Sequence, residues 1–342
     1  MKEILTKLLA MKDLNRKEMQ HVMQQIFLGK ATDSEIAAFL TALRMKGETA
    51  DEIATIAEVI RTQASIGNVS LPNMFDNCGT GGDRSFSFNI STTVAFVLAG
   101  AGVTVAKHGN RSVSSKTGSA DVLEKLGVSL TLSNEETHTM LEENHISFLF
   151  APHIHQSLRP FMKVRKDLGL PTVFNLIGPL TNPLPLDSQL IGVYEKNKVP
   201  LIAEALQKLG RKRAIVLHGA GGMDEASLAG ENHLMLLDNG QLTSFTLTAT
   251  DVGLPAHSNQ AIQGGDTLEN AKILRSVLRN EPSAYLDTVL LNAGIAFFAN
   301  GKTPSIQAGI HLATKTIASG AAMKRLETLI HFSQQQKERI CQ

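Results

Sequence analysis

Short runs rich in Val, Ile and Leu alternate with helical segments through most of this chain. Strands of this kind, joined by helices, are typical of a mostly parallel sheet with crossover connections. We therefore predict an α/β fold with a mostly parallel central sheet. The expected strands are Val103–Ala106, Phe148–Phe150, Ser188–Tyr194, Ala214–His218 and His233–Leu237, and the expected long buried helices are Tyr285–Ala299 and Ile306–Ser319.

The first 65 or so residues have a different pattern, with apolar residues at helical spacing throughout. Three capping boxes predict helix starts, at Asn15 with Glu18, Thr32 with Glu35, and Thr49 with Glu52. Gly29 and Gly47 stand where helices should end. We expect a helical domain over 1–70, a linker over 66–75, and an α/β domain over 71–342. Spare apolar helix faces could pack internally or form a dimer interface.

Length and charge narrow the class of protein. With 342 residues the chain is long enough for two domains, and its net charge of +1 gives no basic field for nucleic acid. Its start lacks the apolar run of a secretory signal, and the longest apolar stretch, Val94 to Val103, is too short to cross a membrane. Cys78 and Cys341 lie at opposite ends of the chain, which fits a reducing compartment. We expect a cytoplasmic protein.

The segment from Asp76 to Ala120 holds seven glycines and twelve Ser or Thr residues. Glycines allow close backbone approach to a ligand and hydroxyls supply donors, a composition suited to phosphate. The loop Gly79–Asp83 is followed by a helix that Asn89 should cap. The third glycine of a dinucleotide-binding fingerprint would fall at Arg84, and no Walker A sequence is present. Taken alone, this loop is more simply a tight turn and a capped helix.

A second loop of the same character makes phosphate binding the better interpretation. Lys107–Ser112 follows the predicted strand Val103–Ala106, at the end where α/β folds place ligands. Ser114, Ser115, Gly118 and Ser119 continue it into another helix. Two such loops about 25 residues apart predict a ligand with two separated phosphates or a pyrophosphate.

Four motifs in order, GTGGD, NIST, KHGNRSVSS and GSAD, resemble those of the anthranilate phosphoribosyltransferase family. The resemblance continues through Arg165, Phe174–Pro183 (FNLIGPLTNP) and Gly222–Ser227 (GMDEAS), and so covers nearly the whole chain. It implies a small helical domain, joined by a segment around 165–185, and a larger α/β domain like those of nucleoside phosphorylases and phosphoribosyltransferases. It also implies a homodimer through the N-terminal helices, and transfer of the phosphoribosyl group of phosphoribosyl pyrophosphate to the anthranilate amine in tryptophan biosynthesis.

The resemblance assigns residues to both substrates and to Mg²⁺. For phosphoribosyl pyrophosphate they are Gly79, Gly82, Asp83, Ser87, Asn89, Ile90, Ser91, Thr92, Lys107, His108, Gly109, Asn110, Arg111, Ser112, Val113, Ser114, Ser115 and Ser119. For anthranilate they are Gly79, Asn110 and Arg165, with His153 and His155 in the approach channel, and for Mg²⁺ they are Ser91, Asp224 and Glu225. No residue is a compelling general base: His108 is a weak candidate, and a structural role is as probable. Cys78 has no evident base partner and is better explained by packing.

Four positions depart from the family pattern: Arg84, Ser87, Pro171 and Ala321. Two other functions remain open at this point. A pyrimidine nucleoside phosphorylase would share the fold and the phosphate loop, but KHGNR and FNLIGPLTNP fit the transferase better. A non-catalytic nucleic-acid-binding relative should be basic and should have lost the metal and anthranilate residues, whereas this chain keeps them.

Overall fold

The computed structural model describes residues 1–66, 69–112 and 116–340, and within them seven strands form one sheet in the order β3-β2-β1-β4-β5-β6-β7. Neighbouring strands from β3 to β5 are parallel, whereas β6 and β7 pair antiparallel, so the sheet is mostly parallel as predicted. The strands are β1 (Phe75–Gly79), β2 (Val105–Gly109), β3 (Ile146–Phe150), β4 (Ser188–Gly192), β5 (Arg213–His218), β6 (Asn232–Asp238) and β7 (Gln241–Leu247).

Strands β1 and β7 were not predicted from the sequence, and β2 begins and ends later in the chain than predicted. The central strand β1 occupies the end of the expected linker and the start of the glycine loop, and the edge strand β7 follows β6 through an Asn239-Gly240 turn. The second strand runs to Gly109, so Lys107 and His108 belong to β2 and not to the loop after it. Consecutive strand residues point to opposite faces of a sheet, which separates these two side chains.

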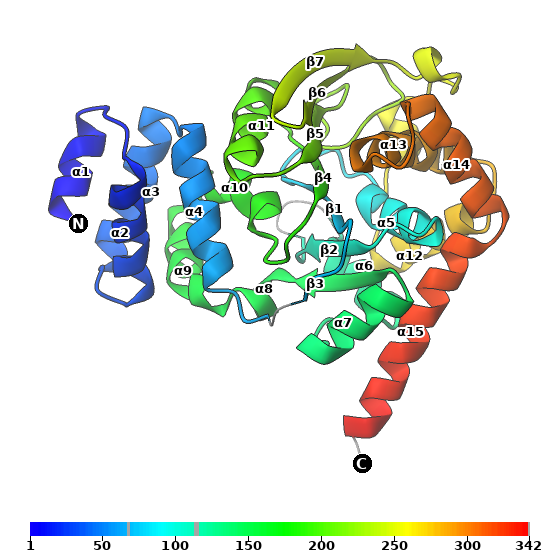
Figure 1. Ribbon diagram of the computed structural model, residues 1–342, viewed down its shortest axis with the longest axis horizontal. Coiled ribbons are helices and arrows are strands. Elements are labelled where there is room, and N and C mark those ends of the chain that lie inside the picture. The colour runs from blue at the N-terminus through cyan, green and yellow to red at the C-terminus, as the bar shows by residue number, and fades with distance from the viewer. Residues whose placement is uncertain (67–68, 113–115, 341–342) are drawn as a thin grey trace.

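The N-terminal residues form a four-helix bundle beside the sheet (Figure 1). Its helices are α1 (Lys2–Leu9), α2 (Arg16–Phe27), α3 (Asp33–Lys46) and α4 (Ala50–Thr62). The three predicted capping boxes are confirmed, at Asn15, Thr32 and Thr49. The bundle shares one hydrophobic core with Phe161, Val164 and Phe174. These three come from α9 (Arg159–Leu168) and α10 (Phe174–Ile177), which follow the short α8 (Ala151–Ile154), and they tie the bundle to the middle of the chain.

Helices cover both faces of the sheet (Figure 1). On the bundle side lies α11 (Val199–Lys208), and on the other side α5 (Ile90–Gly100) and α13 (Ala284–Asn300) pack with α14 (Ile306–Ala318). Gly294 and Gly309 let α13 and α14 approach closely, since a Cβ on either glycine would meet the backbone of the other helix. The remaining helices are α6 (Ser119–Leu126), α7 (Asn134–Glu143), α12 (Thr267–Leu278) and α15 (Ala321–Ile340). In the described part of the chain, no helix has the length and apolarity to cross a membrane.

Candidate active site

Three glycines at strand ends let the segment 219–225 lie across the carboxyl edge of the sheet. A Cβ on Gly79, at the end of β1, would overlap the carboxylate of Asp224. A Cβ on Gly192, at the end of β4, would overlap the main-chain carbonyl of Asp224, and one on Gly219 would overlap that of Glu225. The composition predicts close approach of a glycine backbone to a ligand. In the structure, these glycines also let the strand ends approach Asp224 and Glu225 of the same chain.

The glycine loop is bound directly to Asp224. The N–H of Gly81 donates to Asp224 Oδ2 at 2.6 Å, and the N–H of Asp224 donates to Asp83 Oδ2 at 3.5 Å. Gly81 and Gly82 have φ of 68° and 87°, in the left-handed region that favours glycine. The ring of Tyr194 lies behind Gly82, where a Cβ would meet its Cε1 at 3.5 Å. Tyr194, which follows β4, thus supports the loop, a role that no sequence motif indicated.

Negative charge gathers where these segments meet. Burial raises the pKa of Asp224 well above its usual range, and the nearby carboxylates of Asp83 and Glu225 raise it further. Burial also raises the pKa of Glu225 to about 7, against the opposing effect of the Lys107 ammonium. Among the described residues no three His, Cys, Asp or Glu side chains make up a complete metal site. Mg²⁺ takes few protein ligands and keeps water or phosphate oxygens, so this acidic cluster still fits it.

The start of α5 faces the same acidic cluster. The N–H of Ser91 donates to Glu225 Oε1 at 3.1 Å, so the N-terminus of α5 points at the acidic cluster beside the glycine loop. Asn89 holds the N-cap position, but its side chain makes no capping hydrogen bond, and that expectation is wrong. Its amide instead donates to the carbonyl of Thr117 at 3.1 Å and accepts from Asn270 at 3.0 Å. Asn89 therefore joins α5 to the second loop.

Lys107 is buried beneath Ser91. Its ammonium donates to the carbonyl of Asn77 at 2.5 Å and to Ser91 Oγ at 3.3 Å. The side chain of Asn77 in turn donates to the carbonyl of Ser91 at 2.8 Å. The structure thus shows Lys107 as a buried cation that holds the first turn of α5 and sits near Glu225. The sequence pattern predicted Lys107 directly after the strand, as a positive charge for phosphate.

His108 lies on the opposite face of the sheet, the face toward the helical bundle. Its ring packs edge-on against that of His155, with centroids 5.2 Å apart. The main-chain N–H of His108 donates to Asp76 Oδ1 at 3.2 Å. Burial lowers the pKa of His108 to about 3 and that of His155 to about 4. Both rings are therefore neutral near pH 7. The environment of His108 agrees with the structural role that the sequence left open.

The second loop is organised by Asp121, the last residue of the GSAD motif. Its carboxylate accepts from the N–H of Ser112 at 3.1 Å, from that of Gly118 at 2.9 Å, and from Arg111 Nη1 at 2.9 Å. Arg111 also pairs with Glu124 at 2.9 Å. An acidic residue in the first turn of α6 that gathers loop amides is a recognisable signal. Val113, Ser114 and Ser115 lie outside the described residues.

The predicted hydroxyls of both loops come together. Thr92 Oγ1 donates to Ser119 Oγ at 2.9 Å, which joins the first turn of α5 to the first turn of α6. Ser87 accepts from Ser85 Oγ at 3.2 Å, and the exposed Asn110 accepts from the N–H of Arg111 at 2.7 Å. The remaining predicted donor-site residues, Ile90 and Gly109, are buried at the start of α5 and the end of β2.

Arg165 projects from α9 and is half-buried. Its guanidinium lies over the ring of Phe174, 5.2 Å from the centroid, and Nη1 contacts Met162 Sδ at 3.4 Å. His153 is exposed, whereas His155 is buried beside His108. Burial raises the pKa of the Cys78 thiol to about 12, so the thiol stays protonated and packing explains it.

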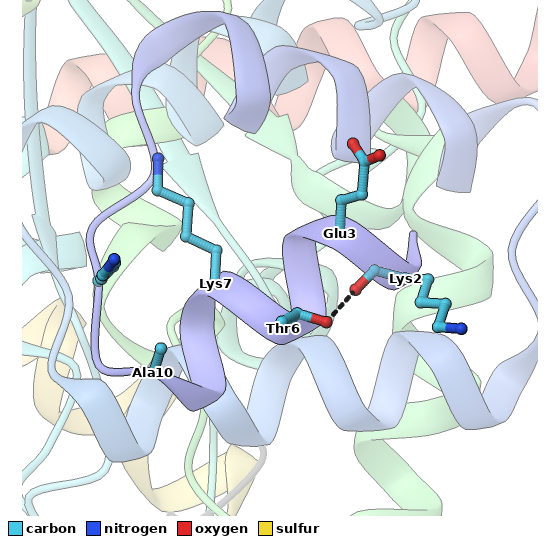
Figure 2. A pocket seen from close by; sticks show the side chains of 6 residues that line it. Lys2, Glu3, Thr6, Lys7 and Ala10 are labelled. Carbon is cyan, nitrogen blue, oxygen red and sulfur yellow. Dashed lines mark hydrogen bonds between the residues drawn. The ribbon is translucent and has the colours of Figure 1, made fainter.

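A separate hollow of 460 Å³ lies on the helical bundle, along α1 (Figure 2). Lys2, Glu3, Thr6 and Lys7 line it, and the hydroxyl of Thr6 donates to the carbonyl of Lys2 at 3.0 Å. The ammonium of Lys7 is bound to Glu18 at 2.6 Å. None of the predicted site residues borders this hollow.

A helical bundle beside an α/β domain with glycine loops at its strand ends defines a two-domain glycosyl transferase. The family described as "Glycosyl transferase family, helical bundle domain" matches residues 2–64, and "Glycosyl transferase family, a/b domain" matches residues 71–323. The anthranilate phosphoribosyltransferase of Oceanobacillus iheyensis is 57% identical over 339 residues, which covers 99% of each chain. With this identity over nearly full length, the chain belongs to the anthranilate phosphoribosyltransferase family.

Solved structures agree with this membership. The anthranilate phosphoribosyltransferase of Thermus thermophilus superposes with a TM-score of 0.92 at 40% identity, covering 97% of this chain and 99% of that one. The enzyme of Saccharomyces cerevisiae in complex with PRPP and Mg gives a TM-score of 0.89 at 28% identity, covering 97% of each chain. The same yeast enzyme has also been solved in complex with 4-fluoroanthranilate. The predicted fold is thereby confirmed, and these relatives do not support the phosphorylase or nucleic-acid-binding alternatives.

Proposed function

We propose that this chain transfers the phosphoribosyl group of phosphoribosyl pyrophosphate to the amino group of anthranilate. The products are N-(5-phosphoribosyl)anthranilate and pyrophosphate, a step of tryptophan biosynthesis. One observation carries the proposal: the glycine loop, the N-terminus of α5 and the Asp224-Glu225 pair meet at one edge of the sheet. That arrangement suits a ligand that brings both a pyrophosphate and a metal ion. The yeast relative in complex with PRPP and Mg supports it.

The donor would be held by the two loops and the start of α5. One side of this site would be Gly79, Gly82, Asp83, Ser87, Asn89, Ile90, Ser91 and Thr92, and the other would be Gly109, Asn110, Arg111, Ser112 and Ser119. Val113, Ser114 and Ser115 stay part of the proposal from the sequence alone, whereas His108 faces away from this site. Lys107 would act indirectly, because its ammonium donates a hydrogen bond to Ser91 Oγ at 3.3 Å and so positions that hydroxyl. Asp121 keeps the amides of Ser112 and Gly118 in place. Backbone N–H groups and hydroxyls then stabilise charge as it develops on the leaving pyrophosphate.

Asp224 and Glu225 would hold Mg²⁺, with the Ser91 hydroxyl beside them. The observation behind this is their electrostatics: the Asp83 carboxylate lies close enough to raise the pKa of both Asp224 and Glu225, and Glu225 also raises that of Asp224. A bound divalent cation would neutralise charge on the leaving phosphate oxygens. The protein's own part is to fix the two carboxylates, through the N–H groups of Gly81 and Ser91.

For the acceptor we propose Arg165, Asn110 and the backbone of Gly79, with His153 and His155 along the approach. A guanidinium can bind a carboxylate through two parallel hydrogen bonds, which orients the aromatic amine. That amine is already neutral, so attack on the ribose carbon requires placement rather than a general base. Neutral His108 on the bundle face of the sheet fits a mechanism without such a base.

We also propose a cytoplasmic homodimer that associates through the N-terminal helices. Large apolar side chains of the bundle are exposed there, among them Leu9, Met11 and Met45. Within each chain we propose a helical domain over 1–70 and an α/β domain over 71–342. The segment around 165–185 would join the helical domain. The core that α9 and α10 share with the bundle supports that division.

Mixing the protein with Mg²⁺, phosphoribosyl pyrophosphate and anthranilate tests the activity. Anthranilate fluorescence should fall as the amine is ribosylated, and pyrophosphate should appear in equal amount. Leaving out the donor is the control, because it should leave the fluorescence constant. No fluorescence loss at high enzyme concentration would refute the proposal.

A further inference from the structure

Arg165 has an aromatic ring as its principal partner. Its guanidinium lies 5.2 Å from the centroid of Phe174, and its Nη1 also contacts the Met162 sulfur at 3.4 Å. Burial lowers the pKa of Arg165, and no carboxylate among the described residues opposes that effect. A half-buried arginine without an acidic partner is well placed to receive an anion from outside the chain.

A contact with a ring face does not use the N–H groups of an arginine as conventional hydrogen-bond donors. The guanidinium carbon of Arg165 lies over the Phe174 ring, whereas a carboxylate would be bound through the N–H groups. An arginine side chain also loses rotamer freedom when it binds, and a side chain already held on a ring has less to lose. The ring is therefore suited to hold Arg165 in its binding orientation.

Phe174 is itself rigidly supported. Its ring packs against the fully buried Phe161 with centroids 4.8 Å apart, and Phe161 packs edge-on against Phe27 of α2 at 5.8 Å. The turn that starts α10 is fixed as well, since the N–H of Thr172 donates to Asn175 Oδ1 at 2.9 Å. Three aromatic rings thus run from the helical bundle to Arg165.

We infer that Phe174 is a positioning residue for the acceptor carboxylate, acting through the guanidinium of Arg165 and supported by Phe161 and Phe27. This inference rests on the proposed role of Arg165. It assigns a function to the first residue of the FNLIGPLTNP segment, and it makes acceptor affinity depend on packing in the helical bundle.

Substitution of Phe174 by Leu removes the ring but keeps an apolar side chain, and Phe174→Tyr keeps the ring. Phe174→Leu should raise the KM for anthranilate by about 2- to 30-fold, the range expected for a lost cation–π contact. The KM for phosphoribosyl pyrophosphate should stay unchanged, and Phe174→Tyr should restore the KM for anthranilate. Phe174→Met is a second ring-less variant if the Leu variant folds poorly.

Phe298→Leu is the matched control. The Arg213 guanidinium lies over the Phe298 ring, 5.0 Å from its centroid, and this pair is not part of the proposed site. It should lower the melting temperature without changing either KM. Phe174→Leu should also have no further effect in an Arg165→Ala background, because the ring acts only through the arginine. A wild-type KM for anthranilate in both Phe174→Leu and Phe174→Met, or equal rises in both KM values, would overturn the inference.

The Arg165→Ala variant separates this inference from the proposed function. If Arg165→Ala raises the KM for anthranilate but the Phe174 variants do not, only the role of Phe174 is wrong. If Arg165→Ala leaves that KM unchanged, the acceptor site itself has been misplaced, and the inference fails with it.

Discussion

The backbone of Gly79 lies so close to the carboxylate of Asp224 that a Cβ at position 79 would overlap Asp224 Oδ2. Gly79 is the last residue of β1, and Asp224 lies in the connection between β5 and β6. The N–H of Gly81 donates to the same Asp224 oxygen at 2.6 Å. The loop proposed for the donor and a ligand proposed for the metal therefore form one unit. A displacement of either should disturb both.

Gly79→Ala tests that unit. The added methyl must push the Asp224 carboxylate or the loop aside, and overpacking of this kind costs about 1–3 kcal/mol. We expect kcat/KM to fall by at least about tenfold, with a higher Mg²⁺ requirement. Gly230→Ala is the control, because its Cβ would meet only the Ala220 methyl at 3.3 Å. A Gly79→Ala enzyme with an unchanged Mg²⁺ titration would contradict the coupling.

The acidic cluster predicts opposite effects on stability and on metal response. In the double variant Asp224→Asn with Glu225→Gln, the buried like charges are removed, so without Mg²⁺ the melting temperature should stay the same or rise. The increase in melting temperature that Mg²⁺ gives the wild type should disappear, and the Mg²⁺ midpoint for activity should rise at least about tenfold. Asp238→Asn, at a carboxylate paired with Arg213 elsewhere, should keep the wild-type Mg²⁺ response. A full Mg²⁺ shift in the double variant would show that the metal ligands lie elsewhere.

Local sequence patterns were sufficient for much of the fold. Capping boxes located three of the four bundle helices, because a cap depends on residues only three positions apart. Strand β1 was missed because it carries Asp76 and Asn77, which are atypical of a central strand. Asn182, His108 and Ser91, from other parts of the chain, hydrogen-bond these buried side chains. Strand β7 was readable in principle, since Asn239-Gly240 after β6 is a strong hairpin signal.

Motifs predicted several residues that the structure gathers at one edge of the sheet, but they did not predict how these residues are arranged. The motifs named the loops and the acidic pair, and the structure brings both to one edge of the sheet. Which side chains are buried depends on strand register, which sequence spacing did not give. Extension of β2 to Gly109 placed Lys107 beneath Ser91 and turned His108 to the other face. Tyr194 and Phe174 support the site through ring contacts that no short motif encodes.

Arg84 stands in a backbone conformation that favours glycine. Its φ is 56°, in the left-handed region, which costs a residue with a Cβ about 1 kcal/mol or more. Arg84→Asn should raise the free energy of unfolding by about 0.5–1 kcal/mol, since Asn tolerates this region better. Arg84→Lys keeps the strain, so chemical denaturation should show no increase in its free energy of unfolding. Equal stability of the Asn and Lys variants would show that the backbone is not strained there.

The buried histidines predict how stability depends on pH. Burial holds the pKa of His108 at about 3, whereas an unfolded histidine titrates near about 6.5, so between these values only the unfolded chain binds the proton. The contribution of neutral His108 is therefore complete above about pH 6.5 and is lost as the pH falls toward 3. His155, with a pKa of about 4, acts in the same direction. Asp76 opposes them, because burial raises its pKa to about 6 and the folded chain takes up that proton first.

Comparison of variants isolates the histidine contribution from that of Asp76. His108→Gln is neutral at every pH, so its free energy of unfolding should fall less steeply than that of the wild type between about pH 6.5 and 4. The difference in slope should approach about 1.4 kcal/mol per pH unit, the value for one proton. Urea denaturation at several pH values measures it, and His138→Gln on the exposed side of α7 is the control. Parallel pH profiles for His108→Gln and the wild type would mean that His108 is protonated in the folded protein, and a catalytic role for it would have to be reconsidered.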